Sequence, residues 1–378
     1  FYRRSPPEAR EELDKLKDKY KTYSIPSARE RIGDALEDDK KHHTLVKQCA
    51  KSFAQTDLSQ RSGYEFYFAE PLIEFGSAKK GNHNFDLFLY NEGENRAIFI
   101  ECKSSITDVK KTLKEVGLAR DMVLEKTDYL SEAIDIELDP NRFEYVLCIS
   151  EKDKMKVIES MKAQGQKPQP KYDIDRIKVW VYAPRSQLIQ LLLECSHENS
   201  ALNEMLHAGF GDQNLHRQYE LPYCYSTNPY RLIQLAIIGE CYRKNLFDDG
   251  IEDPKIIQKS MVFSTLMANI SLGVSDDRKA RMVTEKLRTV LEYGQRYQLF
   301  DEVSADAIRL NCRGSRLRAV LENIDAKFIE RWVDEKAGAE GERLALEDYR
   351  KSAMRDQSTL SEFFRRDDTY PDRDGSDV

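Results

Sequence analysis

Three residues, Asp86, Glu101 and Lys103, have the types and spacing that metal-assisted phosphodiester hydrolysis requires. Two carboxylates can hold Mg²⁺ together with substrate phosphate oxygens and water. The bound ion acidifies a water molecule and stabilises the charge that develops on the phosphate. A neighbouring lysine orients the attacking water or, as the neutral amine, deprotonates it, and in its ammonium form it adds positive charge beside the phosphate. The three side chains therefore predict a hydrolytic site.

Two short apolar segments, residues 84–90 and 97–104, must bring these side chains together. Both are rich in Ile, Phe, Leu and Tyr, and the polar residues 91–96 between them suit a hairpin turn. Because side chains alternate between the faces of a strand, Glu101 and Lys103 point the same way. A hairpin that turns near Gly93 brings Asp86 opposite Glu101.

The pattern Asp86…Glu101-Cys102-Lys103 resembles that of the PD-(D/E)xK nuclease superfamily, which has the restriction-endonuclease-like fold. By this resemblance Asp86 and Glu101 bind Mg²⁺ or Mn²⁺, the backbone carbonyl of Cys102 is a candidate third ligand, and Lys103 is the catalytic lysine. Phe85 stands where the family usually has a proline.

Other features weaken the match. Many family members use a glutamate from the preceding helix, but the helical segment 44–53 carries none, and Glu70 is a weak substitute. A chain with 66 acidic and 59 basic residues also produces such patterns by chance. An apolar strand that leads directly into Glu101 favours the nuclease interpretation over a surface hairpin.

The order of predicted elements indicates an α/β fold, with a mixed sheet flanked by helices. The resemblance to the nuclease fold covers residues 42–196. Apolar patterns in this range predict strands at 64–75, 143–149 and 177–182, and helices at 106–130, 153–164 and 185–195. Ser105 or Thr107 is the expected cap of the helix 106–130.

The chain divides into four predicted parts: an N-terminal helical arm (1–41), the nuclease-like domain (42–196), a mainly helical domain (197–340) and a flexible tail (341–378). In the third part, a helix at 253–270, a Leu-Gly-Val-Ser turn, a helix at 276–297 and a short strand at 307–311 resemble a winged helix-turn-helix. A plain helical bundle explains the same apolar spacing, so both interpretations stay open.

The net charge of −7 argues against a uniformly basic surface, although a local basic groove suffices for DNA. Two clusters are candidates for phosphate contacts, and a solvated helix face is the commoner meaning of each. The candidate DNA-binding residues are Lys80, Lys110, Lys111 and Lys114 near the hairpin, and Arg278, Lys279 and Arg281 in the third part.

The polar C-terminal region contains an apolar motif made of Gln357, Leu360, Phe363 and Phe364. Its spacing is similar to that of the PIP box, with which archaeal and eukaryotic replication and repair proteins bind the sliding clamp PCNA. The resemblance implies a clamp-binding plug. The alternative is a helix end that folds back onto its own domain.

The cysteine, histidine and hydropathy patterns bear on the cellular location of the protein and on its redox environment. Seven scattered cysteines without a CxxC pair indicate a reducing interior and argue against a zinc module. The histidines, of which His42 and His43 are the only pair, are expected at the surface. With neither a membrane-spanning run nor a signal peptide in the sequence, we expect a protein that works inside the cell, in an archaeal cytoplasm or a eukaryotic nucleus.

Taken together, these features predict a metal-dependent DNA endonuclease of DNA repair or genome maintenance, tethered to PCNA. The resemblance to restriction-like enzymes makes a homodimer a reasonable expectation. Two alternatives remain: a catalytically inactive DNA-binding scaffold with the nuclease fold, and a restriction or defence nuclease, including one that acts on RNA.

Overall fold

The computed structural model forms two compact units: residues Phe1–Ala35 with Asp325–Val378 (unit 1), and Leu36–Ile324 (unit 2). Within the part of the chain that the structure describes, no helix is both long and apolar enough to cross a membrane. The structure describes residues 7–54, 56–73, 84–165, 177–186, 188–192, 195–210, 224–234, 256–311 and 317–367, with side chains to residue 352.

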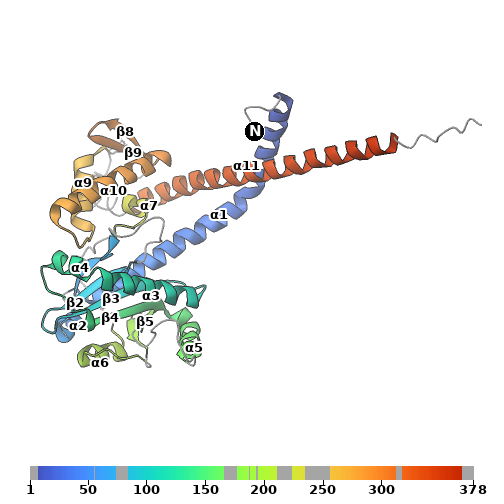
Figure 1. Ribbon diagram of the computed structural model, residues 1–378. Helices are drawn as coiled ribbons and strands as arrows, with labels where there is room; N and C mark the ends of the chain where they lie inside the picture. Colours follow the sequence, from blue (N-terminus) through green and yellow to red (C-terminus); the bar gives the residue numbers. More distant parts are fainter. Residues whose placement is uncertain are drawn as a thin grey trace, which may run out of the picture. The chain divides into compact units, whose positions relative to one another are not determined.

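Unit 1 is built from parts of two long helices that cross (Figure 1). They are α1 (Pro7–Ser52), which continues into unit 2, and α11 (Leu317–Asp367), which begins there. The Tyr20 hydroxyl on α1 donates a hydrogen bond of 2.8 Å to Asp348 on α11. Apolar residues from both helices are buried, among them Leu13, Ile32 and Ala345. The sequence predicted an N-terminal arm to residue 41 and a flexible tail from 341. Helix α1 runs past residue 41 to Ser52, helix α11 runs past residue 341 to Asp367, and residues 368–378 lie outside the described part of the chain.

Unit 2 contains a mixed six-stranded sheet with the strand order β1-β2-β3-β4-β5-β6. Strands β1 to β3 form an antiparallel meander, β3, β4 and β5 are parallel, and β6 returns antiparallel to β5. The predicted α/β fold, a mixed sheet with flanking helices, is confirmed. The strands are β1 (Glu65–Ala69), β2 (Leu87–Asn91), β3 (Arg96–Lys103), β4 (Phe143–Ser150), β5 (Ile177–Ala183) and β6 (Leu188–Leu191).

Helix α3 shows why these sequences fold as they do. Its buried stripe of Leu113, Val116, Ala119 and Val123 has helical spacing, and the Asp108 side chain caps its first turn by accepting the Lys111 N–H at 3.1 Å. Ser105 and Thr107 are therefore not the cap, and the predicted helix 106–130 is broken at residue 126. The other helices around the sheet are α2 (Asp57–Ser62), α3 (Val109–Glu125), α4 (Thr127–Ile134), α5 (Lys154–Gly165), α6 (Ser200–Ala208) and the 3₁₀ turns η3 (Pro140–Arg142) and η4 (Glu151–Asp153).

The predicted helix at residues 185–195 is wrong, because strand β6 occupies this segment. Its residues alternate in burial, with Ile189 and Leu191 inward and Gln190 exposed. Ile189 also exchanges backbone hydrogen bonds of 2.7 and 2.9 Å with Phe210. Ladder bonds on both sides therefore overrule the weak helical preference of a leucine-rich run.

His197 corrects the expectation that the histidines lie at the surface. Its ring is buried, where Nε2 accepts a hydrogen bond of 2.9 Å from the Trp180 indole and Nδ1 lies 2.8 Å from the Glu144 carboxylate. Burial by itself would raise the pKa of Glu144, but the contact with His197 lowers it. This network ties β4 and β5 to the segment that precedes α6.

The remainder of unit 2 combines helices with a small antiparallel sheet of the order β7-β9-β8. The predicted helix at 253–270 begins at Lys259, because strand β7 precedes it. Buried Val283 and Val290 lie on one face of α10. The elements are α7 (Pro229–Leu232), β7 (Ile256–Gln258), α9 (Lys259–Asn269), α10 (Asp276–Arg296), β8 (Phe300–Ser304) and β9 (Ala307–Leu310).

Candidate functional site

The hairpin of β2 and β3 places Asp86 beside Glu101, as the sequence predicted. Leu87 pairs with Ile100, and the Asp86 N–H donates a bond of 2.9 Å to the carbonyl of Ile100. The Asp86 carboxylate accepts the backbone N–H of Cys102 at 2.6 Å. The backbone of β3 thereby fixes the aspartate at the carboxyl end of the strand.

Phe85, the residue before Asp86, anchors this end of the hairpin in the core. Its ring is buried and lies 5.7 Å from the rings of both Phe99 and Tyr145. Packing of an aromatic side chain thus holds the residue before Asp86 in place.

Lys103 and Glu101 form a close ion pair on one face of β3. The Nζ–Oε1 distance is 2.6 Å, and the side chains are 30% and 12% exposed. The pair is therefore partly shielded from water but open enough for a ligand to reach it.

The two carboxylates repel one another, and the pKa values of both respond. Burial, followed by the charge of Asp86, raises the pKa of Glu101 to about 8. Burial would also raise the pKa of Asp86, but His42, the Cys102 N–H and Lys103 together lower it. Asp86 is therefore the more acidic of the two carboxyl groups, and positive charge such as that of Lys103 favours the ionised form of Glu101.

His42 is a site residue that the sequence did not predict, because its contact with Asp86 comes from another element. It lies on α1, its Nε2 is 3.5 Å from Asp86 Oδ1, and its side chain is 41% exposed. Burial would lower the pKa of His42, but the charge of Asp86 raises it to about 9. The signal was its helical spacing from Leu45 and Cys49, which face the sheet.

Glu70, which the sequence offered as a weak candidate for a further acidic residue, lies next to the site but is already engaged. Its N–H donates to the Asp86 carbonyl at 3.0 Å, and its carboxylate accepts the Ser226 N–H at 3.0 Å. Burial raises the pKa of Glu70, and the charge of Asp86 adds to this shift. Lys286 of α10 is held nearby by a bond of 2.8 Å to the carbonyl of Thr227.

Asp86 and Glu101 fit a hard divalent cation by their chemistry. Both offer carboxylate oxygens, the ligands that Mg²⁺ and Mn²⁺ prefer, and their mutual repulsion is relieved by a cation. Neither joins a third His, Cys, Asp or Glu in a tight cluster among the residues that the structure describes. Such an ion would thus take its other ligands from the Cys102 carbonyl, water or substrate.

Three buried cysteines, Cys49, Cys102 and Cys148, form the tight cluster that the described residues do contain, with ligand atoms within 4.8 Å of one another. The sulfurs of Cys49 and Cys148 are 3.5 Å apart. Nothing in the spacing of the cysteines predicted this convergence. Their soft thiols do not suit Mg²⁺, and the Cys102 side chain points away from the face that carries Glu101.

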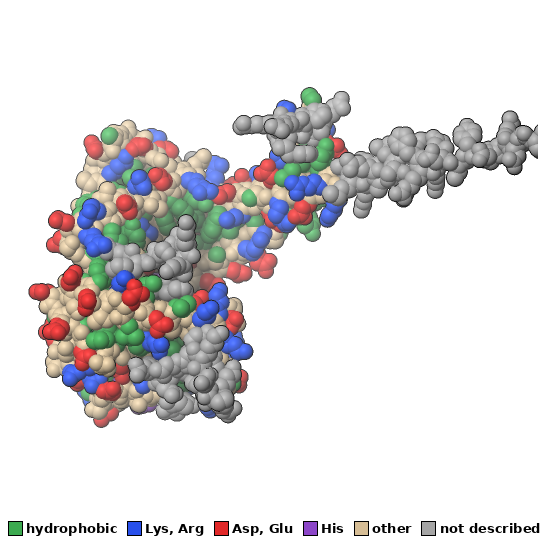
Figure 2. Space-filling model, viewed as in Figure 1, with side chains coloured by type: hydrophobic (Ala, Val, Ile, Leu, Met, Phe, Trp, Pro, Cys, Tyr) green, Lys and Arg blue, Asp and Glu red, His purple; other side chains and the backbone are tan. Residues whose placement is uncertain are grey.

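The candidate DNA-binding residues have different surroundings. Lys110, Lys111 and Lys114 are exposed on α3, whereas Lys80 lies outside the described residues. On the face shown in Figure 2, positive and negative side chains are intermingled.

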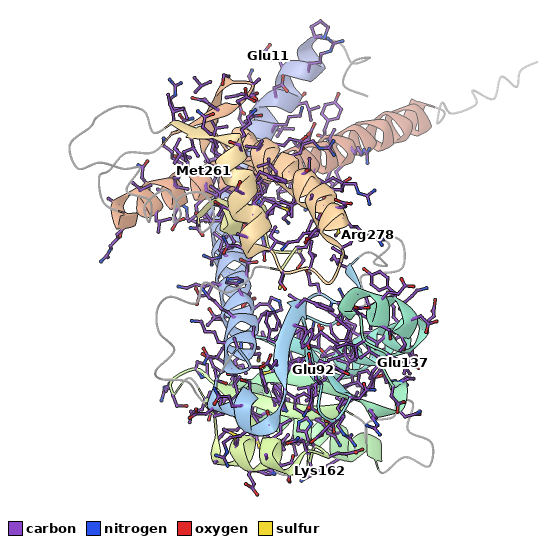
Figure 3. The ribbon with its side chains drawn as sticks, turned by 90° about the vertical axis from the view of Figure 1, so that its left-hand side faces the viewer. Glu11, Glu92, Glu137, Lys162, Met261 and Arg278 are labelled. Carbon is purple, nitrogen blue, oxygen red and sulfur yellow. The ribbon has the colours of Figure 1, made fainter. Side chains whose placement is uncertain are left out.

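On α10, Arg278 lies 5.8 Å from the Tyr129 ring (Figure 3), and burial lowers the pKa of Lys279. Arg281 is exposed. The clamp-binding candidates Gln357, Leu360, Phe363 and Phe364 fall within α11, and their side chains lie outside the described part of the chain.

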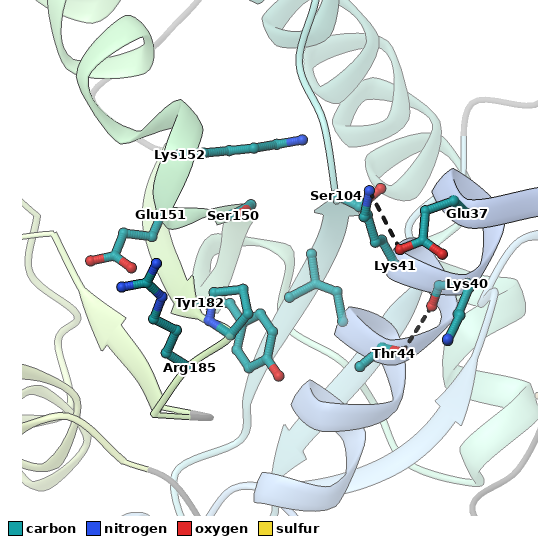
Figure 4. A pocket seen from close by; sticks show the side chains of 12 residues that line it. Glu37, Lys40, Lys41, Thr44, Ser104, Ser150, Glu151, Lys152, Tyr182 and Arg185 are labelled. Atoms are coloured by element: carbon teal, nitrogen blue, oxygen red, sulfur yellow. Dashed lines mark hydrogen bonds and ion pairs between the residues drawn. The ribbon is translucent and has the colours of Figure 1, made fainter. Parts of the chain in front are cut away.

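A cavity of about 780 Å³ opens where β3, β4 and β5 end (Figure 4). Two residues that line the cavity, Ser104 and Lys41, are sequence neighbours of Lys103 and His42, and no residue of the hairpin site lines the cavity itself. Its lining residues are Glu37, Lys40, Lys41, Thr44, Leu45, Ser104, Ser150, Glu151, Lys152, Tyr182, Pro184 and Arg185.

Comparison with known proteins gives one relative without a described function. The chain is 24% identical over 349 residues to an uncharacterized protein of the archaeon Archaeoglobus fulgidus, which covers 88% of this chain and 91% of that protein. No family model and no solved structure matches the chain.

Proposed function

We propose that the protein is a metal-dependent DNA endonuclease. The observation that carries this proposal is the convergence of Asp86, Glu101 and Lys103 on one strand pair, with two carboxylates whose repulsion calls for a cation. A structural surface hairpin has no reason to bury two acidic side chains side by side.

Each residue has a defined part in this proposal. Asp86 and Glu101 would hold Mg²⁺ or Mn²⁺, which when bound acidifies water and offsets charge on the phosphate. The Cys102 N–H keeps the Asp86 carboxylate in position, and His42 stabilises its charged form. Lys103 pairs with Glu101 in this structure, and its ammonium would add positive charge beside the phosphate or orient the attacking water.

Cleavage assays with titrated Mg²⁺ test the assignment. Plasmid, branched, flapped and single-stranded substrates are incubated with the wild type, Asp86→Asn and Lys103→Ala. We expect each variant to lose at least 100-fold in rate while it still unfolds cooperatively in a thermal melt, because each removes a group that acts on the reacting atoms. Asp57→Asn and Lys162→Ala, at exposed positions outside the site, are the controls. Wild-type rates in both site variants refute the assignment.

A catalytically inactive scaffold is the second candidate, and one contact favours it. The Lys103–Glu101 ion pair already neutralises one of the two proposed ligands. DNA binding by the wild type without cleavage of any substrate, at every Mg²⁺ or Mn²⁺ concentration, supports this candidate over the endonuclease.

We also infer a winged-helix part that contacts DNA. Strand β7, helices α9 and α10, and the β8–β9 hairpin follow one another in the order expected for such a module, and the sheet order β7-β9-β8 suits it. Arg278 is engaged with Tyr129, so exposed Arg281 is the better contact candidate. Arg281→Ala is expected to weaken duplex binding several-fold in an anisotropy assay, and unchanged binding contradicts this role.

The tail motif supports a further proposal, that Gln357, Leu360, Phe363 and Phe364 bind the sliding clamp PCNA. A tether of this kind raises the effective concentration of an enzyme on DNA and compensates for a net charge of −7. A protein that acts on clamp-loaded DNA would be intracellular and would serve genome maintenance.

A further inference from the structure

The cavity at the ends of the parallel strands has the size and position of a ligand site. Its volume of about 780 Å³ lies within the range of small-molecule and nucleotide pockets. Ser104 follows β3, Ser150 ends β4, and Pro184 follows β5, so the carboxyl edge of the parallel strands forms one wall. In open α/β sheets ligands bind at this edge.

The charge of the cavity selects an anion. Four cationic and two acidic side chains line it, although the whole chain carries a net charge of −7. Lys41 lies 3.6 Å from Glu37, whereas Lys40, Lys152 and Arg185 form no ion pair within the described residues. Figure 4 shows Lys152 and Arg185 on one side of the cavity and Lys40 and Lys41 on the other. These free cations suit phosphate groups.

The same cavity also offers apolar surface. Buried Leu45 and Tyr182 lie at its wall with Pro184, and the hydroxyls of Ser104 and Ser150 lie at its edge. An aromatic ring beside cations is the combination with which proteins hold single nucleotides of a strand, because every base stacks on an aromatic face and every phosphate needs a cation.

We propose that this cavity binds an unpaired nucleotide of the strand whose neighbouring phosphate lies at Lys103. The preferred substrates are therefore single-stranded, overhanging or flapped DNA, because a paired base inside a duplex cannot enter a cavity of this size. This inference rests on the proposed nuclease function, whose hairpin site directly adjoins Ser104.

Binding without catalysis tests the cavity separately from the nuclease. Fluorescence anisotropy with the full chain in EDTA compares a single-stranded oligonucleotide, a blunt duplex and a duplex with a single-stranded flap. The pocket variant Lys152→Ala/Arg185→Ala removes two exposed cations. The control Arg61→Ala/Lys162→Ala removes the same charge from exposed positions outside the cavity.

We expect the wild type to bind single-stranded and flapped DNA more tightly than blunt duplex, and the pocket variant to lose about 10-fold on these two substrates. Its duplex affinity is expected to match that of the control. A second variant, Tyr182→Leu, is expected to weaken binding of unpaired strands about 10-fold, whereas Tyr182→Phe, which keeps the ring, binds normally. Thermal melting verifies that both variants are folded.

Two results overturn the proposal: equal losses in the pocket and control variants, or a wild type that binds blunt duplex as tightly as unpaired strands. Addition of Mg²⁺ separates the two hypotheses. If binding depends on the pocket but no DNA is cleaved, the nuclease hypothesis is refuted and the cavity hypothesis stands. If the pocket variant cleaves flapped DNA at the wild-type rate, the cavity hypothesis is refuted and the nuclease hypothesis stands.

Discussion

Two acidic side chains lie at one poorly hydrated end of a hairpin, and ionisation is less favourable for Glu101 than for Asp86. Asp86 has the Cys102 N–H at 2.6 Å and His42 at 3.5 Å to stabilise its charge, whereas Glu101 relies on Lys103. The charge of Glu101 is therefore costly until a cation arrives, which is the usual state of a metal-binding pair before metal is bound.

This cost predicts a pH-dependent stability. The pKa of Glu101 is about 8 in the folded protein, above its ordinary value of 4.5, so the folded state keeps a proton that the unfolded chain releases. Stability from this group is therefore lost as pH rises from 4.5 through 8. In metal-free thermal melts, the wild type is expected to lose on the order of 2 kcal/mol relative to Glu101→Gln between pH 5 and pH 8.

Mg²⁺ provides the matched measurement. Because the ion binds the ionised carboxyl, it is expected to raise the melting temperature of the wild type more at pH 8 than at pH 5, and to leave Glu101→Gln nearly unchanged. A difference between wild type and variant that stays constant with pH contradicts the raised pKa.

At the scale of elements, the packing of α1 against α11 depends on one glycine. A Cβ at position 341 would lie 2.6 Å from the backbone nitrogen of Lys21 and 2.9 Å from its Cα, whereas a Cβ at Gly338 would meet nothing within 4 Å. The two positions lie on the same helix and differ only in what faces them. They form a natural pair of test and control.

Gly341→Ala is expected to destabilise unit 1 by about 1–3 kcal/mol, because the helices must move apart. Gly338→Ala is expected to stabilise α11 by about 0.5–1 kcal/mol through helix propensity. Amide hydrogen exchange of α1 and α11 measures both effects, with β3 and β4 as an internal reference. The packing argument is refuted if the two helices exchange faster in Gly338→Ala than in the wild type, or if they exchange no faster in Gly341→Ala.

Elements whose pattern is local were predictable from the sequence, and the failures have physical causes. Strands β2 and β3 carry their own turn and alternation, so the hairpin and its register followed directly. Strand β6 did not, because its short leucine-rich run fits a helix until β5 and Phe210 pair with it. Helix α11 was underestimated because its charged surface resembles disorder, although i,i+4 pairs such as Arg343–Glu347 support a helix.

At the scale of the whole molecule, the proposed clamp contact predicts a separable function. Phe363→Ala/Phe364→Ala is expected to weaken PCNA binding at least 10-fold and to leave cleavage of short oligonucleotides unchanged. The motif would have to rearrange from the end of α11 to dock as a 3₁₀ turn. Isothermal titration with purified clamp measures this. Arg365→Ala/Arg366→Ala is the neighbouring control, and equal affinities in the two variants refute the tether.

The candidate site was also only partly predictable. Asp86, Glu101 and Lys103 belong to a hairpin whose two strands follow one another in the sequence, so their spacing was enough to find them. His42 comes to Asp86 from another element, and the cavity is made by residues of α1 and three strand ends, so both depend on tertiary packing that spacing within one strand does not specify.

The crossing of α1 and α11 joins residues that are 328 positions apart, as in the bond between Tyr20 and Asp348. During synthesis the α1 part of this pair is made long before its partner in α11. Unit 2 can form its core while the apolar residues Leu13, Ala28 and Ile32 are not yet covered by α11 and are accessible to chaperones. This helix pair can therefore close only after α11 (Leu317–Asp367) has been translated.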